Sequence, residues 1–531
     1  MFLGGNLMNF KPLLILPFLF LVVSCGSSER ALEIKEREIQ HIDDHYRNFY
    51  EIFPISFADS NGDGKGDLQG IIDKFDYIKS LNMNGLWLTP VHPSDSYHKY
   101  DVKDYKNIDS TFGSLATYDA LVKKCHDNNM EIILDLVLNH SSVDHPWFQQ
   151  AINAHINNNT SNKYYNYYVI KPYTGTVPQG YARYGNSNYI YECPFWSGMP
   201  DFNIESILDG SNTALMDDFR DIAKFWLVDH KVDGFRLDAV TSYVSDDTEK
   251  NCQFLNWFKA EVDKIKPNTY IVGEVLKSSA VYGQYYNNSN IDSFFCFDDV
   301  GKLGNNIYQS IISESIVAVN KYINNDITNS SSHIPAPLLG NHDSAAGGRS
   351  TKSYLEDSKL VHALLAMGNG ATFEYYGDEI GMKQIDGGKD EDIRQPLYWG
   401  DSYTCVPVSG SSEGTSLQKY PYGSVKEQEN DANSLLNYFS KAYKYRLENP
   451  ELARGSSEIY YKSDDDSYGI IKREYNGSSL YIAMNLSSSL TGEVDLSKLD
   501  VEAVGDLSIN DKPYYKGNSL VLPPYSIVLL H

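Results

Sequence analysis

Short apolar segments alternate along the chain with stretches whose apolar residues recur at helical spacing. Helical patterns such as SLATYDALVKKCHDNN and DDFRDIAKFWLVDH separate most of the strand-like segments. Strand-then-helix units repeated in this order predict an α/β fold, a (β/α)8 or TIM barrel. The strand candidates, rich in β-branched and aromatic residues, are FYEIFPISF, GLWLTPV, EIILDLVLNH, DGFRLDAV, TYIVGEV, IDSFFCF, PAPLLGNHD and ATFEYYGDE.

The spacing of these units is uneven in one place. The stretch between His140 and Asp233 is rich in Asn and Tyr and is too long for one loop and one helix. We therefore predict a small inserted domain at residues 141–204, with the barrel in two parts at 46–140 and 205–452. Alternating segments such as YGIIKREY, SLYIAMNLS and LVLPPYSIVLL then predict a C-terminal antiparallel β-sandwich at residues 453–531.

Composition narrows the possible partners. The 531 residues include 70 acidic and 45 basic side chains, a net charge of −25. Binding to phosphate backbones needs clustered Lys and Arg, so this balance argues against a nucleic-acid partner.

The N-terminus has the pattern of a targeting segment. Lys11 precedes an apolar run from Pro12 to Val23, which is shorter than the roughly 20 residues of a membrane span. The run is typical of a signal peptide at residues 1–24. VVSC resembles a bacterial lipobox, which implies lipidation of Cys25, a tether at residues 25–45 and a membrane partner at the bacterial cell envelope. The alternative is a soluble secreted protein in which Cys25 is coincidental.

The other cysteines, widely spaced and without a CxxC or Cys/His metal pattern, are expected to be mostly buried thiols, with room for one disulfide. They are Cys125, Cys193, Cys252, Cys296 and Cys405.

The stretch FADSNGDGKGDLQG alternates oxygen-bearing side chains in the manner of a calcium loop. An EF-hand would need a Glu at its twelfth position, which is Gly70 here, and would join two helices. This loop instead joins a predicted strand to a predicted helix. We therefore predict a structural Ca²⁺ site rather than a calcium sensor; the alternative is a turn that binds nothing. The side-chain ligands would be Asp59, Asn61, Asp63 and Asp67.

The carboxyl ends of the barrel strands carry the candidate chemistry, because active sites of such barrels lie there. Unpaired charges resist burial, so polar groups at several neighbouring strand ends are hard to explain by stability alone. Two carboxyl groups facing one bond are what glycoside hydrolysis needs. The residues are Asn139 and His140 after the third strand, Arg236 and Asp238 on the fourth, Glu274 on the fifth, and His342 and Asp343 on the seventh.

These segments carry a family resemblance. LDLVLNH, GFRLDAV, GEV and LLGNHD resemble, in order, four motifs of the α-amylase family of glycoside hydrolases, and MPDFN resembles a further motif near the end of that family's inserted domain. SYHKYDVKDY and YYGDEIGM are similar to its second- and eighth-strand landmarks, and DSNGDGKGD to the calcium loop of its oligosaccharide-acting branch. The resemblance runs from about Tyr46 to the C-terminus.

The resemblance implies a role for each matching residue. Asp238 corresponds to the catalytic nucleophile, Glu274 to the general acid/base, and Asp343 to the third carboxylate, which holds sugar hydroxyls. Substrate-binding roles follow for an arginine that keeps the nucleophile ionised, two sugar-binding histidines and an aromatic platform. These are Arg236, His140, His342 and Tyr100. The same resemblance adds the Lys65 carbonyl to the calcium ligands.

One position departs from the family pattern. Many α-amylases follow the nucleophile with a Lys-His pair that supports a calcium ion between barrel and inserted domain, where this chain has Thr241 and Ser242. The departure puts that second ion in doubt, and with it any use of Asn139 as a ligand.

The function expected is retaining hydrolysis of α-1,4 bonds in starch-like glucans. In the oligosaccharide branch, a Val directly after the nucleophile tends to accompany α-1,6 cleavage, and this chain has Ala239 there; the Met of MPDFN agrees more weakly. The alternatives are an exo-acting α-glucosidase or an oligo-1,6-glucosidase. A non-catalytic relative, similar to amino-acid transporter heavy chains, is a third hypothesis that the intact carboxylate set disfavours.

Overall fold

The computed structural model describes residues 29–245, 247–277, 279–296, 305–324, 333–344, 355–384, 389–412 and 420–531. The expected signal peptide and Cys25 lie outside these residues. Within them, no helix has the length and apolarity needed to cross a membrane.

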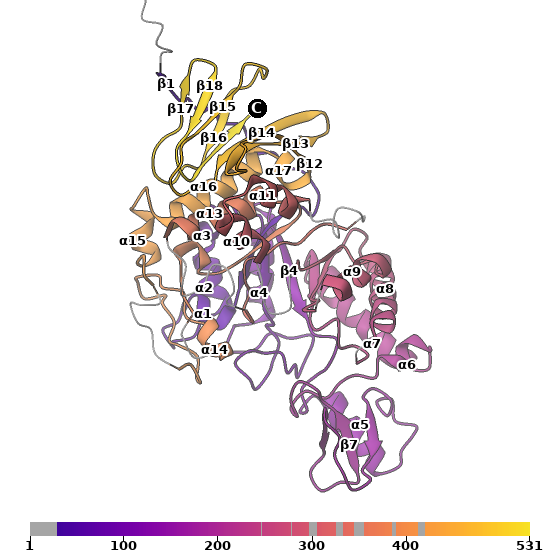
Figure 1. Ribbon diagram of the computed structural model, residues 1–531. Coiled ribbons are helices and arrows are strands. Elements are labelled where there is room, and N and C mark those ends of the chain that lie inside the picture. Colours follow the sequence, from indigo (N-terminus) through magenta and orange to yellow (C-terminus); the bar gives the residue numbers. More distant parts are fainter. Residues whose placement is uncertain are drawn as a thin grey trace, which may run out of the picture.

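A parallel sheet curls into the centre of the molecule (Figure 1). Its strand order is β10-β9-β8-β4-β3-β2-β11. Parallel bridges from Phe295 to Ala336 and from Leu338 to Phe373 place the PAPLLGNHD segment between β10 and β11 and close the ring. The predicted TIM barrel is thereby confirmed. The strands are β2 (Asn48–Ile52), β3 (Gly85–Leu88), β4 (Glu131–Leu136), β8 (Gly234–Leu237), β9 (Tyr270–Gly273), β10 (Ser293–Phe294) and β11 (Thr372–Tyr375).

Helices surround the barrel, so its strands are buried on both faces. Side-chain caps begin several of them: Ser114 accepts from Thr117 N and Ser434 from Asn437 N. The helices are α1 (Pro54–Phe57), α2 (Leu68–Asp73), α3 (Phe75–Ser80), α4 (Leu115–His126), α7 (Thr213–Lys224) with a π-helical turn at Phe225–Asp229, α8 (Thr248–Ile265), α9 (Ser279–Asn288), α10 (Asn305–Ile312), α11 (Ile316–Ile323), α13 (Leu355–Met367), a 3-10 turn at Asp378–Ile380, α14 (Asp390–Ile393), α15 (Val425–Glu429), α16 (Leu435–Glu448) and α17 (Glu451–Arg454).

The barrel interior is layered by the two-residue period of its strands. Phe49, Ile133 and Val272 belong to one buried apolar cluster. Two residues further along the same strands stand acidic side chains, Glu51, Asp135 and Glu274. The apolar layer therefore seals one end of the barrel, and the charged layer lies at the carboxyl ends.

The inserted domain lies between β4 and β8 and projects from the barrel at the bottom of Figure 1. It contains α5 (Pro146–Ile156) and an antiparallel sheet ordered β5-β7-β6, with β5 (Ile170–Pro172), β6 (Tyr181–Arg183) and β7 (Tyr189–Glu192); α6 (Glu205–Leu208) leads back to the barrel.

The C-terminal domain packs two antiparallel sheets around its own core. One is ordered β12-β13-β14-β19-β16, and the other contains β17, β18 and β15. This agrees with the predicted sandwich. The strands are β12 (Ser456–Lys462), β13 (Tyr468–Tyr475), β14 (Ser478–Asn485), β15 (Gly492–Asp495), β16 (Ala503–Asp506), β17 (Tyr514–Lys516), β18 (Ser519–Leu522) and β19 (Ser526–Leu530).

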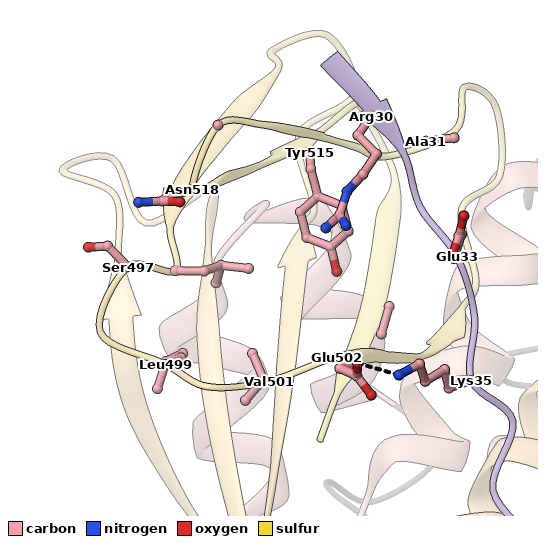
Figure 2. Close-up of a pocket in the computed structure, with 13 residues that line it drawn as sticks. Arg30, Ala31, Glu33, Lys35, Ser497, Leu499, Val501, Glu502, Tyr515 and Asn518 are labelled. Carbon is pink, nitrogen blue, oxygen red and sulfur yellow. Dashed lines mark hydrogen bonds and ion pairs between the residues drawn. The ribbon is translucent and has the colours of Figure 1, made fainter. Parts of the chain in front are cut away.

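The segment expected to be a tether is folded onto this domain from Glu29 onward. Strand β1 (Glu29–Ala31) pairs with β17, and the Arg30 guanidinium lies 4.7 Å from the centre of the Tyr515 ring (Figure 2). Lys35 forms an ion pair with Glu502. The β-sandwich thus gains an edge strand from the opposite end of the chain, a long-range pairing that local sequence pattern does not reveal.

None of the five described cysteines takes part in a disulfide with another described residue. The part of the chain that the structure describes therefore contains no disulfide.

Candidate active site

The centre of the charged layer is a single buried guanidinium. Arg236 is fully buried, and its Nη1 lies 2.9 Å from Asp135 Oδ1 and 2.7 Å from Asp238 Oδ1. Its Nη2 lies 2.9 Å from Glu274 Oε2. One cation therefore holds three carboxyl groups from three adjacent strands.

Strand register brings two of these carboxyl groups side by side. Leu237 of β8 pairs with Gly273 of β9, and Asp238 and Glu274 are the next residues on each strand. Ala239, directly after Asp238, has a φ of 48° in the left-handed region, and its N–H donates to Glu274 Oε2 at 3.3 Å. The two carboxyl groups are thus fixed by a shared arginine and by the backbone turn between them.

Burial sets the proton affinity of this group. It raises the pKa of Glu274, which Arg236 opposes and Asp238 reinforces. It also raises the pKa of Asp238 against the opposing charge of Arg236, and that of Asp135 to about 7. Since one guanidinium cannot neutralise three carboxylates, the cluster is suited to retain a proton near neutral pH.

A second ionic network joins the first through Tyr100. The Tyr100 hydroxyl lies 3.0 Å from Asp135 Oδ2 and 2.7 Å from His342 Nε2. His342 Nε2 also lies 3.0 Å from Asp343 Oδ2, and Arg394 Nη2 lies 2.6 Å from Asp343 Oδ1. Although burial opposes it, the charges of His342 and Arg394 keep the pKa of Asp343 below its ordinary value.

His140 is buried and forms a β-bridge with Asp201 at the end of the inserted domain. Burial lowers its pKa to about 4, so the ring is neutral, and its Nε2 has no hydrogen-bond partner among the described residues. Its ring centre is 5.6 Å from that of Phe195, which is 53% exposed, as Trp196 is at 54%. A free ring nitrogen next to exposed aromatic faces suits a sugar ligand.

Hydrogen bonds and ion pairs join six of the candidates that the sequence suggested, whereas His140 is buried beside them without an ion pair or side-chain hydrogen bond to the group; the six are Tyr100, Arg236, Asp238, Glu274, His342 and Asp343. The structure adds three that the sequence analysis missed. Glu51 and Asp135 are acidic residues inside otherwise apolar strands, a signal that could have found them. Arg394 lies in α14's C-terminal turn and carries no comparable local signal.

The predicted calcium loop is ordered by its own backbone. Asp59 Oδ1 accepts from Gly62 N and Oδ2 from Gly64 N, each at 2.7 Å, and Asp67 caps α2 through Gly70 N at 2.7 Å. Asp59 and Asp67 are buried, yet no Lys, Arg or His side chain of the described residues pairs with either. Among those residues, no group of three or more His, Cys, Asp or Glu side chains could hold a metal by itself.

Residues 51–455 match the α-amylase catalytic domain. The chain belongs to the α-amylase family.

Relatives of this α-amylase-family chain span nearly its whole length. Alpha-amylase 3 of Dictyoglomus thermophilum is 33% identical over 91% of this chain and 93% of its own. Probable oligo-1,6-glucosidase 3 of Bacillus subtilis is 26% identical over 90% and 97%. Among solved structures, Amy13B of Eubacterium rectale is 34% identical, covers 93% of this chain and 97% of its own, and superposes with a TM-score of 0.82. The chain is an α-amylase-type glycosidase that acts on α-glucans.

Proposed function

We propose that this enzyme hydrolyses α-1,4-glucosidic bonds with retention of configuration, through a covalent glycosyl-enzyme. The observation that carries the proposal is the pair Asp238 and Glu274, held side by side at adjacent strand ends by Arg236. A nucleophile and an acid so close suit a double displacement, because an inverting enzyme needs room for a water molecule between its carboxyl groups.

In the first step, Asp238 Oδ attacks the anomeric carbon while Glu274 donates its proton to the glycosidic oxygen. The carbon–oxygen bond to the leaving sugar breaks as the bond to Asp238 forms. Arg236, 2.7 Å from Asp238, favours the ionised nucleophile, and the raised pKa of Glu274 keeps its proton available.

In the second step, Glu274 removes a proton from water, which attacks the same carbon and releases Asp238 as a carboxylate. The Ala239 N–H, 3.3 Å from Glu274 Oε2, stabilises the carboxylate that Glu274 becomes between the steps. Asp343 and His342 would hold the hydroxyl groups of the reacting sugar, with Tyr100 and His140 beside it.

The preference for α-1,4 bonds rests on Ala239. It directly follows Asp238, its backbone N–H contacts Glu274, and its side chain is small; a branched residue there would narrow the space for the leaving sugar. The specific alternative is α-1,6 cleavage, since the Bacillus subtilis relative is named an oligo-1,6-glucosidase. An exo-acting α-glucosidase is the other.

We further propose that the loop at residues 59–67 binds one calcium ion. The donors are all hard oxygens, namely Asp59, Asn61, Asp63 and Asp67 side chains and the Lys65 carbonyl, which suit Ca²⁺. Two buried carboxylates without a basic partner also fit an external cation. The ion's part would be to brace the loop between β2 and α2.

The proposed location is the bacterial cell envelope, with a lipid on Cys25 as anchor. Its support is the lipobox-like VVSC after a short apolar run. Replacing Cys25 with Ser should move the protein from the membrane fraction to the soluble fraction; an unchanged distribution would contradict the anchor.

The function is tested by product analysis on maltoheptaose, pullulan and isomaltotriose, with NMR of the first anomer released. We expect α-configured maltooligosaccharides from maltoheptaose and slower cleavage of isomaltotriose. Release of β-anomers would exclude retention, and faster cleavage of isomaltotriose would select the α-1,6 alternative.

A further inference from the structure

A buried glutamate on β2, the first strand of the barrel, contacts a residue of the active site. Glu51, in β2, is 1% exposed, and its Oε1 lies 2.6 Å from His342 Nδ1 and 3.3 Å from the His342 backbone N. It is held by two contacts to one residue of a distant segment.

His342 is enclosed on its faces as well as at its nitrogens. Its ring stacks on Tyr100 with centres 5.5 Å apart and on Phe53 at 6.3 Å, and meets the edge of Trp87 at 5.8 Å. It is fully buried. The orientation of the ring is therefore fixed, and its charge is decided by the groups at the two nitrogens.

Both ring nitrogens face carboxylate oxygens. Nδ1 meets Glu51 at 2.6 Å and Nε2 meets Asp343 at 3.0 Å. A neutral imidazole has one N–H, so it would leave a lone pair against one of these oxygens, whereas the doubly protonated ring donates to both. The remaining neighbours are Tyr100 at Nε2, Arg394, whose Nε donates to the His342 carbonyl at 3.0 Å, and the more distant charges of Asp135, Arg236, Asp238 and Glu274.

We propose that Glu51 is a positioning residue that keeps His342 cationic, so that Asp343 stays ionised and correctly placed to bind the reacting sugar. The inference rests on the proposed glycosidase function. The electrostatics agree: burial opposes the charge, but Asp343 and Glu51 raise the pKa of His342 to about 10.

A second buried pair of a glutamate and a histidine supplies a control. Glu374, in β11 and also 1% exposed, lies 2.9 Å from Nδ1 of the fully buried His362. The Nε2 of His362 has no hydrogen-bond partner among the described residues, so this pair is not joined to a catalytic carboxylate. Replacing Glu374 removes the same kind of interaction without touching the site.

The experiment compares kcat/KM on maltoheptaose from pH 5 to pH 8 for the wild type, Glu51→Gln, Glu51→Asp and Glu374→Gln. In Glu51→Gln the buried ring should titrate near or below its ordinary value, since the carboxylate at Nδ1 is gone. We expect its activity to fall about threefold or less below wild type at pH 5 and roughly tenfold or more at pH 8. Glu51→Asp should track the wild type more closely, and Glu374→Gln should keep the wild-type profile.

A loss in Glu51→Gln that is equal at every pH would show a merely structural role and overturn the proposal, as would a profile identical to the wild type. A readout independent of catalysis is the NMR titration of ¹³C-labelled histidines, with His342→Asn to identify the resonance. The wild-type ring should stay protonated above pH 8 and titrate lower in Glu51→Gln. A ring already neutral at pH 7 in the wild type would also overturn the proposal. Failure of the glycosidase function would instead appear as a wild type that cleaves no α-glucan.

Discussion

Two acidic clusters of this enzyme compensate the negative charge of their carboxylates in different ways. In the active site, Asp238 and Asp343 face side-chain cations, Arg236 and Arg394. In the loop at residues 59–67, Asp59 and Asp67 are buried against backbone N–H groups and a serine hydroxyl. Backbone donors satisfy hydrogen bonding but carry no full charge, so the loop still favours an added cation, whereas the active site contains cationic side chains of its own.

The two clusters should therefore respond differently to substitution of their carboxylates. Removing a carboxylate of the active site should stop the reaction and leave the fold, because its partners remain paired with other groups. Removing a carboxylate of the loop should weaken the fold and leave the reaction.

The largest expected effect is on turnover. Asp238→Asn and Glu274→Gln should each lower kcat by at least about 10²-fold, because the nucleophile or the acid is lost. Asp59→Asn, in the loop, should leave kcat within about twofold at saturating calcium. Steady-state kinetics measure kcat of each variant, and circular dichroism checks that each variant is folded. Near-normal turnover of either active-site variant would contradict the assignment.

The next effect is on stability and depends on pH. His342→Gln leaves Glu51 and Asp343 without their shared cation and should cost about 3–5 kcal/mol in the free energy of unfolding. Because the pKa of His342 is raised to about 10 in the folded protein, its contribution is full below about pH 6.5 and is lost as pH rises through about 10. Urea unfolding of the wild type and His342→Gln at pH 6, 8 and 10 measures the difference in their free energies of unfolding. A cost that grows with pH would refute the cationic ring.

Calcium should act on the loop alone. Binding to the folded state at about 100 times Kd stabilises by about 2.7 kcal/mol, so chelation should lower Tm and calcium should restore it. In Asp67→Ala this response should disappear, and the loss of the α2 cap should cost about 1 kcal/mol more. If neither chelator nor calcium changes the Tm of the wild type, the loop is a turn that binds no ion.

The smallest expected effect is on linkage choice. Ala239→Val should shift the ratio of kcat/KM for maltotriose over isomaltotriose towards isomaltotriose by about 1–3 kcal/mol. The φ of 48° at this position disfavours a β-branched side chain, so part of any loss will be common to both substrates. Ala239→Ser, unbranched at Cβ, is the matched control and should keep the preference for maltotriose.

The chain's own pattern determined the barrel, the order of its parts and most of the candidate site. Alternating strands and helices are local signals, and the residues after each strand must meet at one end of a parallel barrel. Asp238, Glu274 and Asp343 could therefore be placed together without knowing any contact. The oxygen donors of the loop at residues 59–67 could also be recognised from the sequence, because they are close together along the chain.

The pairing of charged side chains depends on the tertiary structure. Arg394 reaches Asp343 from the end of α14, Glu51 on β2 meets His342 from a segment 291 residues away in sequence, and β1 joins β17 from the far end of the chain. These contacts depend on the closure of the strands into a barrel and on the packing of the N-terminal strand against the C-terminal domain. Local sequence periodicity predicts neither of these arrangements. Burial, which raises the pKa of Glu274, and the contacts of Asp343 and Glu51, which raise the pKa of His342 against burial, are likewise properties of the packed barrel, since side chains in an extended chain are all solvated.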